Sequence, residues 1–182
     1  MLTIRFNGWT VFIMRRLIDI LTAVLLIGVV LVVAARLTEE PVMNAAGPFR
    51  AVDGDSLETP TDRLRLRGID APELRQTCGA DGTVPCGRDA RAALASLIRE
   101  GLTCRTQGRD RFGRGLAECT TQGGDDVARI LVRTGQAVSH GCCAAEEREA
   151  RDRKLGIWAG PFQMPETWRA ERQDFEHPTP DH

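Results

Sequence analysis

The chain has 182 residues, of which 42% are hydrophobic and 27% are charged, and its formal net charge is −1. This length suits one compact domain with an appendage, and the composition is that of an ordinary globular protein. The balanced charge excludes a basic field over the whole molecule, so any binding of nucleic acid has to come from a local patch.

The first predicted element is an apolar run, Leu17 to Ala35, whose one charged residue is Asp19. At about 1.5 Å per residue, a helix of this length spans roughly 28 Å, close to the hydrocarbon thickness of a bilayer. Three arginines precede the run, whereas Arg36 and two glutamates follow it. The positive-inside rule then predicts a cytoplasmic segment over 1–16, a membrane-spanning segment over 17–36 and an outer part beyond it.

A cleaved signal peptide is the main alternative to an uncleaved anchor. Val33 and Ala35 are small enough for the −3 and −1 positions of a cleavage site. The apolar run is, however, longer than the roughly 7–15 residues usual in a signal peptide, which favours the anchor. A buried core helix is the third alternative, but it would show polar positions along one face, and this run shows almost none.

The outer part alternates between short strand-like runs and helical patterns. A polar, Pro-containing linker is predicted over 37–47, a folded domain over 48–169 and a flexible tail over 170–182. Apolar spacing predicts helices over 87–100, 125–134 and 144–155, with Gly101 and Gly135 as stops after the first two. Strands are predicted over 49–52, 57–59, 64–69, 102–106 and 113–119. This order indicates an α+β fold built around a small closed sheet.

The six cysteines all follow the apolar run, in the part predicted to lie outside the cytoplasm, where disulfides persist. Their spacing has no C-x2-C pair and so argues against zinc. Cys104 and Cys119 are equidistant from the turn of a predicted hairpin, where residues face each other across the strands. Cys78 and Cys86 would close a short Gly- and Pro-containing loop. Buried free thiols are the alternative for both pairs, and the adjacent Cys142 and Cys143 are left unassigned.

A local basic patch is visible between Asp62 and Gly115, where eleven arginines face seven acidic residues. Lysine occurs once in the chain, at Lys154. Guanidinium groups bind two phosphate oxygens at once, which an ammonium cannot do. For any single arginine, a solvated surface position is the simpler interpretation.

Four short motifs carry the chemistry: VDGDS at 52–56, RLRGIDAPE at 65–73, DRFGRGLA at 110–117 and GIW at 156–158. Each is weak alone, but in this order and spacing they resemble the thermonuclease family, whose type member is staphylococcal nuclease. The resemblance runs from about Phe49 to Trp168 and includes the closing P-x-x-W-R piece, Pro165 to Arg169. It implies a five-stranded OB-type β-barrel with three helices, here preceded by one transmembrane helix.

The resemblance also implies a calcium (Ca²⁺) site. Asp55 and Asp70 match the two ligand aspartates of the family, and the backbone carbonyl of Ala71 matches a third ligand. Calcium is a hard cation that takes oxygen ligands, so these groups and waters suit it. Asp53 matches a neighbouring acid that supports the metal.

Three further positions match the catalytic residues of the family. Glu73 matches the glutamate that orients or deprotonates the attacking water, and Arg65 and Arg114 match the arginines that neutralise charge on the phosphate. Phe112 takes the place of an aromatic residue that contacts the base. The chain has no tyrosine, although the type member stacks the base on tyrosines.

The resulting hypothesis is a calcium-dependent endonuclease that cuts DNA, RNA or both on the extracytoplasmic side of the membrane, with no protein partner implied. A catalytically silent OB module that binds nucleic acid or protein is the alternative. Three carboxylates facing a polyanion without a metal would weaken such binding, which favours the enzyme.

Overall fold

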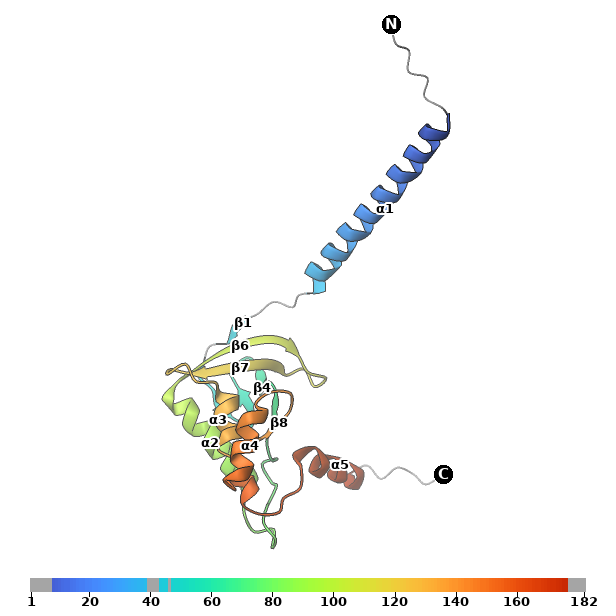
Figure 1. Ribbon diagram of the computed structural model, residues 1–182. Helices are drawn as coiled ribbons and strands as arrows, with labels where there is room; N and C mark the ends of the chain where they lie inside the picture. The colour runs from blue at the N-terminus through green and yellow to red at the C-terminus, as the bar shows by residue number, and fades with distance from the viewer. Residues whose placement is uncertain (1–7, 39–42, 46, 177–182) are drawn as a thin grey trace. The chain divides into compact units, whose positions relative to one another are not determined.

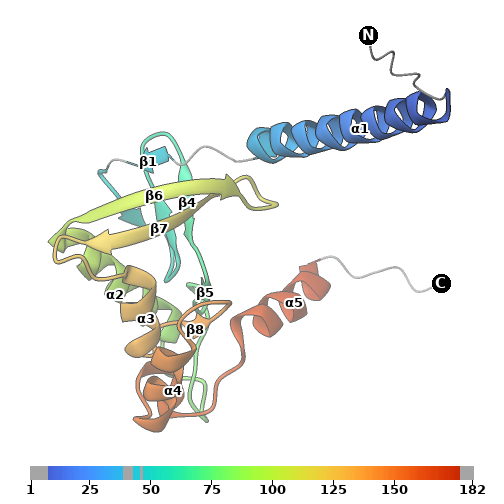
Figure 2. The ribbon, with the colours of Figure 1, turned by 45° about the horizontal axis from the view of Figure 1, so that its top comes forward.

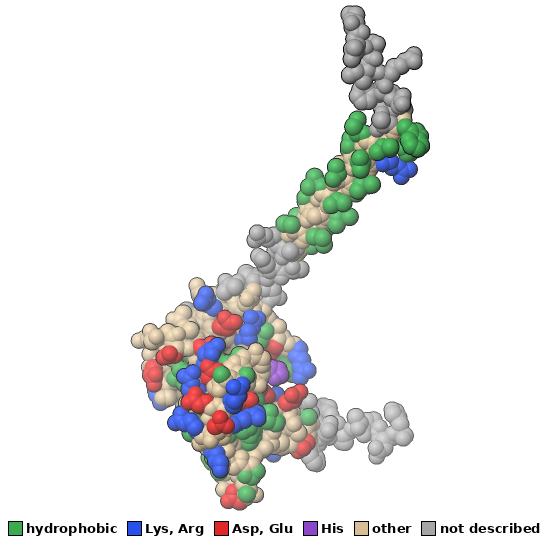
Figure 3. All heavy atoms as spheres, viewed as in Figure 1, with side chains coloured by type: hydrophobic (Ala, Val, Ile, Leu, Met, Phe, Trp, Pro, Cys, Tyr) green, Lys and Arg blue, Asp and Glu red, His purple; other side chains and the backbone are tan. Residues whose placement is uncertain are grey.

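The computed structural model describes residues 8–38, 43–45 and 47–176, and the chain divides into two units, Met1–Pro41 and Val42–His182 (Figure 1). The first unit holds one helix, α1 (Gly8–Thr38). Its segment Phe12–Ala34 is long and apolar enough to cross a bilayer, and none of that segment is buried. In Figure 3 hydrophobic side chains dominate the visible face of α1, whereas acidic and basic side chains are interspersed over the second unit. The helix is therefore a candidate membrane anchor or signal sequence.

The second unit is built on a six-stranded sheet with the order β1-β6-β7-β4-β3-β2. The β4–β7 pair is parallel and every other neighbouring pair is antiparallel. A separate antiparallel pair joins β5 (Ile69–Asp70) to β8 (Val138–Ser139). The six strands of the main sheet are β1 (Met43–Ala45), β2 (Arg50–Ala51), β3 (Ser56–Glu58), β4 (Arg63–Leu66), β6 (Leu102–Arg109) and β7 (Gly115–Thr121).

The α+β order is confirmed, but the described strands form an open sheet of six strands where five strands in a closed barrel are predicted. The additional strand, β1, lies inside the predicted linker and pairs with the edge of β6, with Met43 opposite Thr106. An unpaired edge as long as β6 would expose a row of backbone donors and acceptors, and β1 pairs with the part of that edge from Cys104 to Thr106. The strand predicted over 64–69 is interrupted at Gly68, whose φ of 78° turns the chain between β4 and β5.

Two helices, α2 (Cys86–Glu100) and α3 (Val127–Arg133), lie against one side of the sheet, and α4 (Ala144–Asp152) packs against α3 (Figure 2). They confirm the three helical predictions. Asp126 caps α3 by accepting hydrogen bonds from two backbone N–H groups of its first turn. A short 3₁₀ helix, η1 (Gly156–Ala159), and α5 (Pro165–Glu176) complete the chain. Helix α5 occupies much of the region predicted as a flexible tail; residues 177–182 lie outside the described part.

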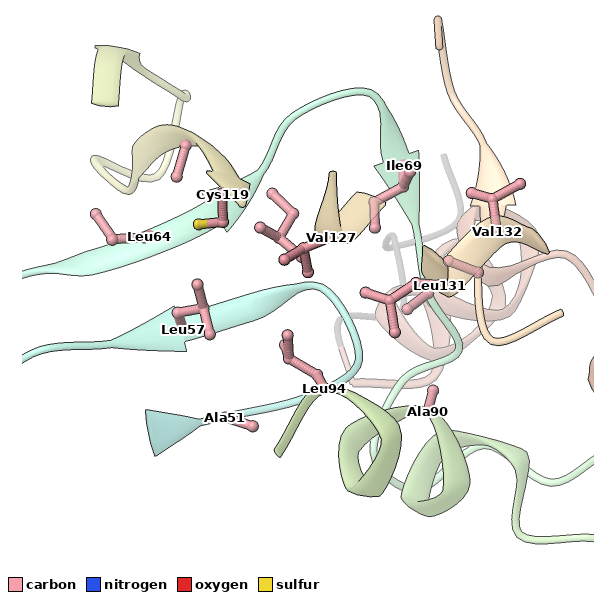
Figure 4. Packing of buried hydrophobic residues seen from close by; sticks show 14 of the residues in the cluster. Ala51, Leu57, Leu64, Ile69, Ala90, Leu94, Cys119, Val127, Leu131 and Val132 are labelled. Atoms are coloured by element: carbon pink, nitrogen blue, oxygen red, sulfur yellow. The ribbon is translucent and has the colours of Figure 1, made fainter. Parts of the chain in front are cut away.

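The core lies between the sheet and helices α2 and α3 (Figure 4). Leu57 and Leu64 point inward from β3 and β4, and Leu94 meets them from α2. All three are at most 1% exposed. The face of α2 that its apolar spacing predicts is therefore the buried one. Its packing holds this helix beside the segment that leads from β2 to β3.

Leu94→Ala is expected to lower the free energy of unfolding by about 2–5 kcal/mol, because it removes a fully buried side chain and leaves a cavity. Urea denaturation followed by circular dichroism measures this loss. Leu74→Ala is the control, since Leu74 is 37% exposed and its truncation removes little buried surface. Equal losses in both variants would contradict the assignment of Leu94 to the core.

Three disulfides close the second unit. The predicted pairs are confirmed, with S–S distances of 2.00 Å for Cys78–Cys86 and 2.03 Å for Cys104–Cys119. Cys104 lies directly opposite Cys119 in the β6–β7 register, as its distance from the hairpin turn predicts. Cys142 and Cys143, unassigned from the sequence, form a disulfide with each other. No cysteine is free, since all six are paired.

Candidate active site

The VDGDS segment forms a tight turn between β2 and β3. The Asp55 N–H donates to Asp53 Oδ1 over 3.0 Å, so the first aspartate of the motif holds the second in place. A Cβ on Gly54 would lie 2.6 Å from the Cβ atoms of both Ala71 and Ala90. Glycine is needed here because the turn packs directly on α2 and on the strand end that carries Asp70.

Asp55 and Asp70 are brought together, as the metal prediction requires. Both side chains are buried, and both contact one atom, Arg65 Nη2, at 2.8 Å from Asp55 Oδ2 and 2.6 Å from Asp70 Oδ1. The Ala71 N–H donates to Asp55 Oδ2 over 3.2 Å. The two carboxylates thus lie within a few ångström of each other, with Ala71 beside them.

The environment of the Asp55 side chain disfavours its ionised form. Burial, and then the negative charge of Asp53, raise the pKa of Asp55 to about 7, although Arg65 and the Ser56 hydroxyl oppose this shift. Burial alone would lower the pKa of Arg65, but the Asp55 and Asp70 carboxylates outweigh it and raise that pKa. A cation beside Asp55 would therefore favour its ionised form.

Arg169, which the sequence prediction left without a role, also binds this cluster. From α5 its Nη1 and Nη2 atoms donate to both oxygens of Asp70, at 3.1 and 2.9 Å, and Nη1 donates to Glu73 Oε1 at 2.9 Å. Burial opposes its charge, but these hydrogen bonds raise the pKa of Arg169 above its usual value. The P-x-x-W-R piece contains Arg169, yet no spacing rule places it beside a residue 99 positions earlier in the chain.

Glu73 lies on the loop that follows β5, and its side chain is 31% exposed. Its backbone N–H donates to Gln76 Oε1, and the buried Gln76 in turn donates through Nε2 to the Gln163 carbonyl. A Cβ on Gly87 would lie 1.8 Å from the Glu73 carbonyl oxygen, so only glycine allows α2 to approach this closely. Gln76, also missed from the sequence, ties the Glu73 loop to the segment before α5.

Arg114 approaches from the β6–β7 hairpin. Its Nε donates to Asp110 Oδ2 over 2.7 Å, and its Nη1 donates to Ser56 Oγ over 3.3 Å. The Ser56 hydroxyl donates to Asp55 Oδ1 over 2.9 Å, so the hairpin arginine connects to the buried aspartate through one hydroxyl group. Desolvation opposes the ionisation of Asp110, but the bonds from Arg114 and the backbone lower its pKa.

Phe112 is 65% exposed at the tip of the same hairpin. The guanidinium carbons of Arg111 and Arg114 lie 4.7 and 5.5 Å from the centre of its ring. A groove of about 410 Å³ runs beside it, lined by Glu58, Thr59, Thr61, Asp62, Arg63, Phe112, Gly113 and Arg114. The groove places an exposed aromatic face next to a positively charged group, a combination that suits a nucleotide.

The oxygen ligands that the structure brings together for a metal are the buried carboxylates of Asp55 and Asp70. No group of three or more His, Cys, Asp or Glu side chains with metal-binding geometry occurs among the residues that the structure describes. Hard oxygen ligands suit calcium, which completes its coordination shell with carbonyls and water. Asp55, Asp70 and the carbonyl of Ala71 therefore fit a calcium ion better than they fit zinc, which favours nitrogen and sulfur ligands.

Comparison with known proteins finds similarity to the staphylococcal nuclease family and to proteins named as nucleases. Residues 63–160 match the family model described as staphylococcal nuclease homologue. A succinoglycan biosynthesis protein of Rhizobium meliloti is 34% identical over 130 residues, which cover 65% of this chain and 65% of that protein. A micrococcal nuclease of Shigella flexneri is 32% identical over 142 residues, covering 66% of this chain and 77% of its own. An uncharacterized endonuclease of Escherichia coli O157:H7 is 30% identical over 132 residues, covering 66% and 81%.

Proposed function

Because the chain belongs to the staphylococcal nuclease family, we propose that it is a calcium-dependent endonuclease that hydrolyses phosphodiester bonds of DNA, RNA or both. One observation carries the proposal: two buried aspartates share Arg65, and Glu73 joins Asp70 through Arg169. Arg114 is connected to Asp55 through the Ser56 hydroxyl. The match covers about two thirds of the length of the succinoglycan biosynthesis protein, so the activity of that whole protein is not assigned to this chain.

In this proposal Asp55, Asp70 and the Ala71 carbonyl hold calcium, and Asp53 fixes the turn that presents Asp55. When bound, the ion supplies Lewis-acid polarisation and orients the phosphate. The raised pKa of Asp55 supports this assignment, because a buried carboxylate that resists ionisation gains most from a divalent cation.

Glu73 orients or deprotonates the attacking water, and its partial exposure leaves it open to solvent and substrate. Arg65 and Arg114 neutralise the charge that develops on the phosphate oxygens. Phe112 offers its exposed ring to a base. With no tyrosine in the chain to add further stacking, base affinity is expected to be lower than in the type member of the family.

The site works outside the cytoplasm in this proposal, in the periplasm or at the cell surface. Arginines before the apolar run Leu17 to Ala35 and glutamates after it predict that orientation, and three disulfides suit an oxidising compartment. An uncleaved α1 tethers the nuclease to the membrane, whereas cleavage after Ala35 would release it. Mass measurement of the mature N-terminus distinguishes the tethered form from the secreted form.

Incubation of the full chain with denatured DNA, in calcium and in excess chelator, tests the enzyme against the silent binding module. The enzyme cuts in calcium and stops in chelator. A silent module retards the DNA on a gel and leaves its length unchanged under both conditions.

Arg169→Gln is expected to tighten calcium binding by up to about tenfold, or about 1.4 kcal/mol, because Arg169 occupies both oxygens of the ligand Asp70. Isothermal titration with calcium measures this change without any turnover. Arg172→Gln is the matched control: Arg172 lies one turn further along α5, stacks on Trp168 at 4.2 Å and has no carboxylate partner in the described chain. Unchanged or weaker affinity in Arg169→Gln would show that Arg169 does not compete with the cation.

A further inference from the structure

A second concentration of positive charge lies between α2 and β2, in a pocket of about 530 Å³. Four of its lining residues are arginines and none is acidic; its apolar floor includes two larger side chains. We name it the α2 arginine pocket and define it by Arg50, Arg88, Arg91, Arg99, Phe49 and Ile98.

The charge of this pocket is mostly uncompensated. Arg50 pairs with Glu58 over 2.8 Å, and Arg91 Nε donates to the Ala51 carbonyl over 3.2 Å, which orients its guanidinium without neutralising it. Arg88 and Arg99 are exposed, and the side chain of neither forms an ion pair or hydrogen bond with any residue that the structure describes. Three guanidiniums therefore face one opening without a carboxylate partner, which favours an anionic ligand.

The apolar residues at the floor of the pocket indicate which kind of anionic ligand fits it. Phe49 and Ile98 are both partly exposed, so an apolar surface lies within the ring of arginines. A lone phosphate needs no such floor, whereas a single nucleic-acid strand brings both phosphates and unstacked bases. Guanidiniums bind phosphate oxygens in pairs and stack on bases, so arginine suits both parts of the strand.

The same helix connects this pocket to the carboxylate site. Gly87 packs on the carbonyl of Glu73, and Ala90 packs on Gly54 in the turn that carries Asp55. Ala51 lines the pocket four residues before Asp55, and an extended chain spans at most about 3.6 Å per residue, so the two places lie no more than about 14 Å apart. Single-strand sites on OB-type folds cover about 4–16 nucleotides, enough to bridge that distance.

We propose that the α2 arginine pocket binds single-stranded nucleic acid several nucleotides away from the bond that is cut. The inference rests on the proposed nuclease function and extends it: the pocket holds long single strands, whereas a dinucleotide occupies only the carboxylate site. Contacts of this kind bind the backbone and do not discriminate sequence.

The test compares the double variant Arg88→Ser/Arg99→Ser with the charge-matched double variant Arg105→Ser/Arg148→Ser in the full chain. Arg105 and Arg148 are likewise exposed and have no ion pair within the described residues. For the first variant, KM for a single-stranded 20-mer is expected to rise about tenfold, while kcat/KM for a dinucleotide stays at the wild-type value. The control variant is expected to match wild type on both substrates, apart from a small general effect of charge.

Binding is measured separately from cleavage, by fluorescence anisotropy of a non-hydrolysable phosphorothioate 20-mer at several salt concentrations. Loss of two phosphate contacts is expected to reduce the slope of log Kd against log salt by about 1.4, since each contact to a single strand contributes about 0.7. A salt slope and a 20-mer KM equal to those of the control variant would overturn the proposal. So would loss of binding to phosphatidylglycerol vesicles with unchanged DNA binding, which would assign the pocket to lipid headgroups.

The two proposals fail in different ways. If wild type binds the 20-mer through Arg88 and Arg99 but cuts nothing in calcium, the nuclease function is wrong and the pocket stands. If wild type cuts both substrates and the variant matches the control, the nuclease function stands and the pocket is wrong.

Discussion

Replacing Glu73 by glutamine is expected to lower kcat on denatured DNA by about 10²- to 10⁴-fold, the range typical for loss of a general base. Glutamine keeps the size of the side chain and its ability to accept a hydrogen bond from Arg169, which reaches Glu73 Oε1 at 2.9 Å. The side chain is 31% exposed and lies outside the core, so the fold is expected to persist. Rates on a labelled single strand, with thermal unfolding of the same samples, measure both effects.

The matched control is Glu118→Gln, a change of the same kind at an exposed position on β7. Glu118 is 69% exposed and lies 3.6 Å from Arg67, in an ion pair that is worth little at the surface. Its turnover is expected to equal that of wild type. A Glu73→Gln variant that turns over at the wild-type rate would remove Glu73 from the reaction.

Arg114→Lys is expected to lower kcat by about 10²- to 10³-fold, close to the effect of removing one group that stabilises transition-state charge. The guanidinium of Arg114 can bind Asp110, Ser56 and a phosphate oxygen at the same time, because its nitrogens point in different directions. Lysine keeps the positive charge but has one nitrogen, which cannot reach all three groups. Stability is expected to change by about 1 kcal/mol or less, because the Asp110 partner keeps an opposite charge nearby.

Arg111→Lys is the control that distinguishes specific contacts of the Arg114 guanidinium from the general positive charge of the hairpin. Arg111 is exposed and packs on the Phe112 ring, without an ion pair among the residues described. Its replacement is expected to raise KM slightly and to leave kcat unchanged. Equal losses of kcat in the two variants would indicate that the hairpin contributes charge only, and that Arg114 has no specific contact with the phosphate.

Much of this architecture follows from local rules that operate within a few residues. The apolar spacing of α2, the cap at Asp126 and the pairing of Cys104 with Cys119 each depend on neighbours in a helix or a hairpin. The motifs also place Asp55, Asp70 and Glu73 in one site, because the turn after β2 and the end of β5 are fixed by Gly54 and Ala71.

The features that the sequence did not predict depend on contacts between distant segments. Arg169 reaches Asp70 across 99 positions, and Gln76 reaches the Gln163 carbonyl across 87. Strand β1 forms because the edge of β6 is free to pair, and Met43 has no strand pattern of its own that would predict it. The Cys142–Cys143 pair could not be assigned because adjacency alone does not favour bonding.

The two buried aspartates are stabilised next to each other by the arginines that bind them. Arg65 bridges Asp55 and Asp70, and Arg169 binds Asp70 and Glu73, so two guanidiniums face three carboxylates. One uncompensated negative charge remains, before Asp53 is counted. A divalent cation would make the cluster net positive as long as both arginines stay in place. Arg169 is therefore expected to weaken calcium binding, because its positive charge repels the ion and it occupies the oxygens of Asp70.

The most direct test titrates calcium into the metal-free full chain and follows binding and cleavage of a single-stranded oligonucleotide in the same samples. Binding of the oligonucleotide and its hydrolysis are expected to reach half of their maximum at the same calcium concentration. Asp55→Asn is expected to weaken both together. Cleavage at an unchanged rate in excess chelator, or cleavage in Asp55→Asn with the calcium dependence of wild type, would contradict a calcium-dependent nuclease site at Asp55 and Asp70.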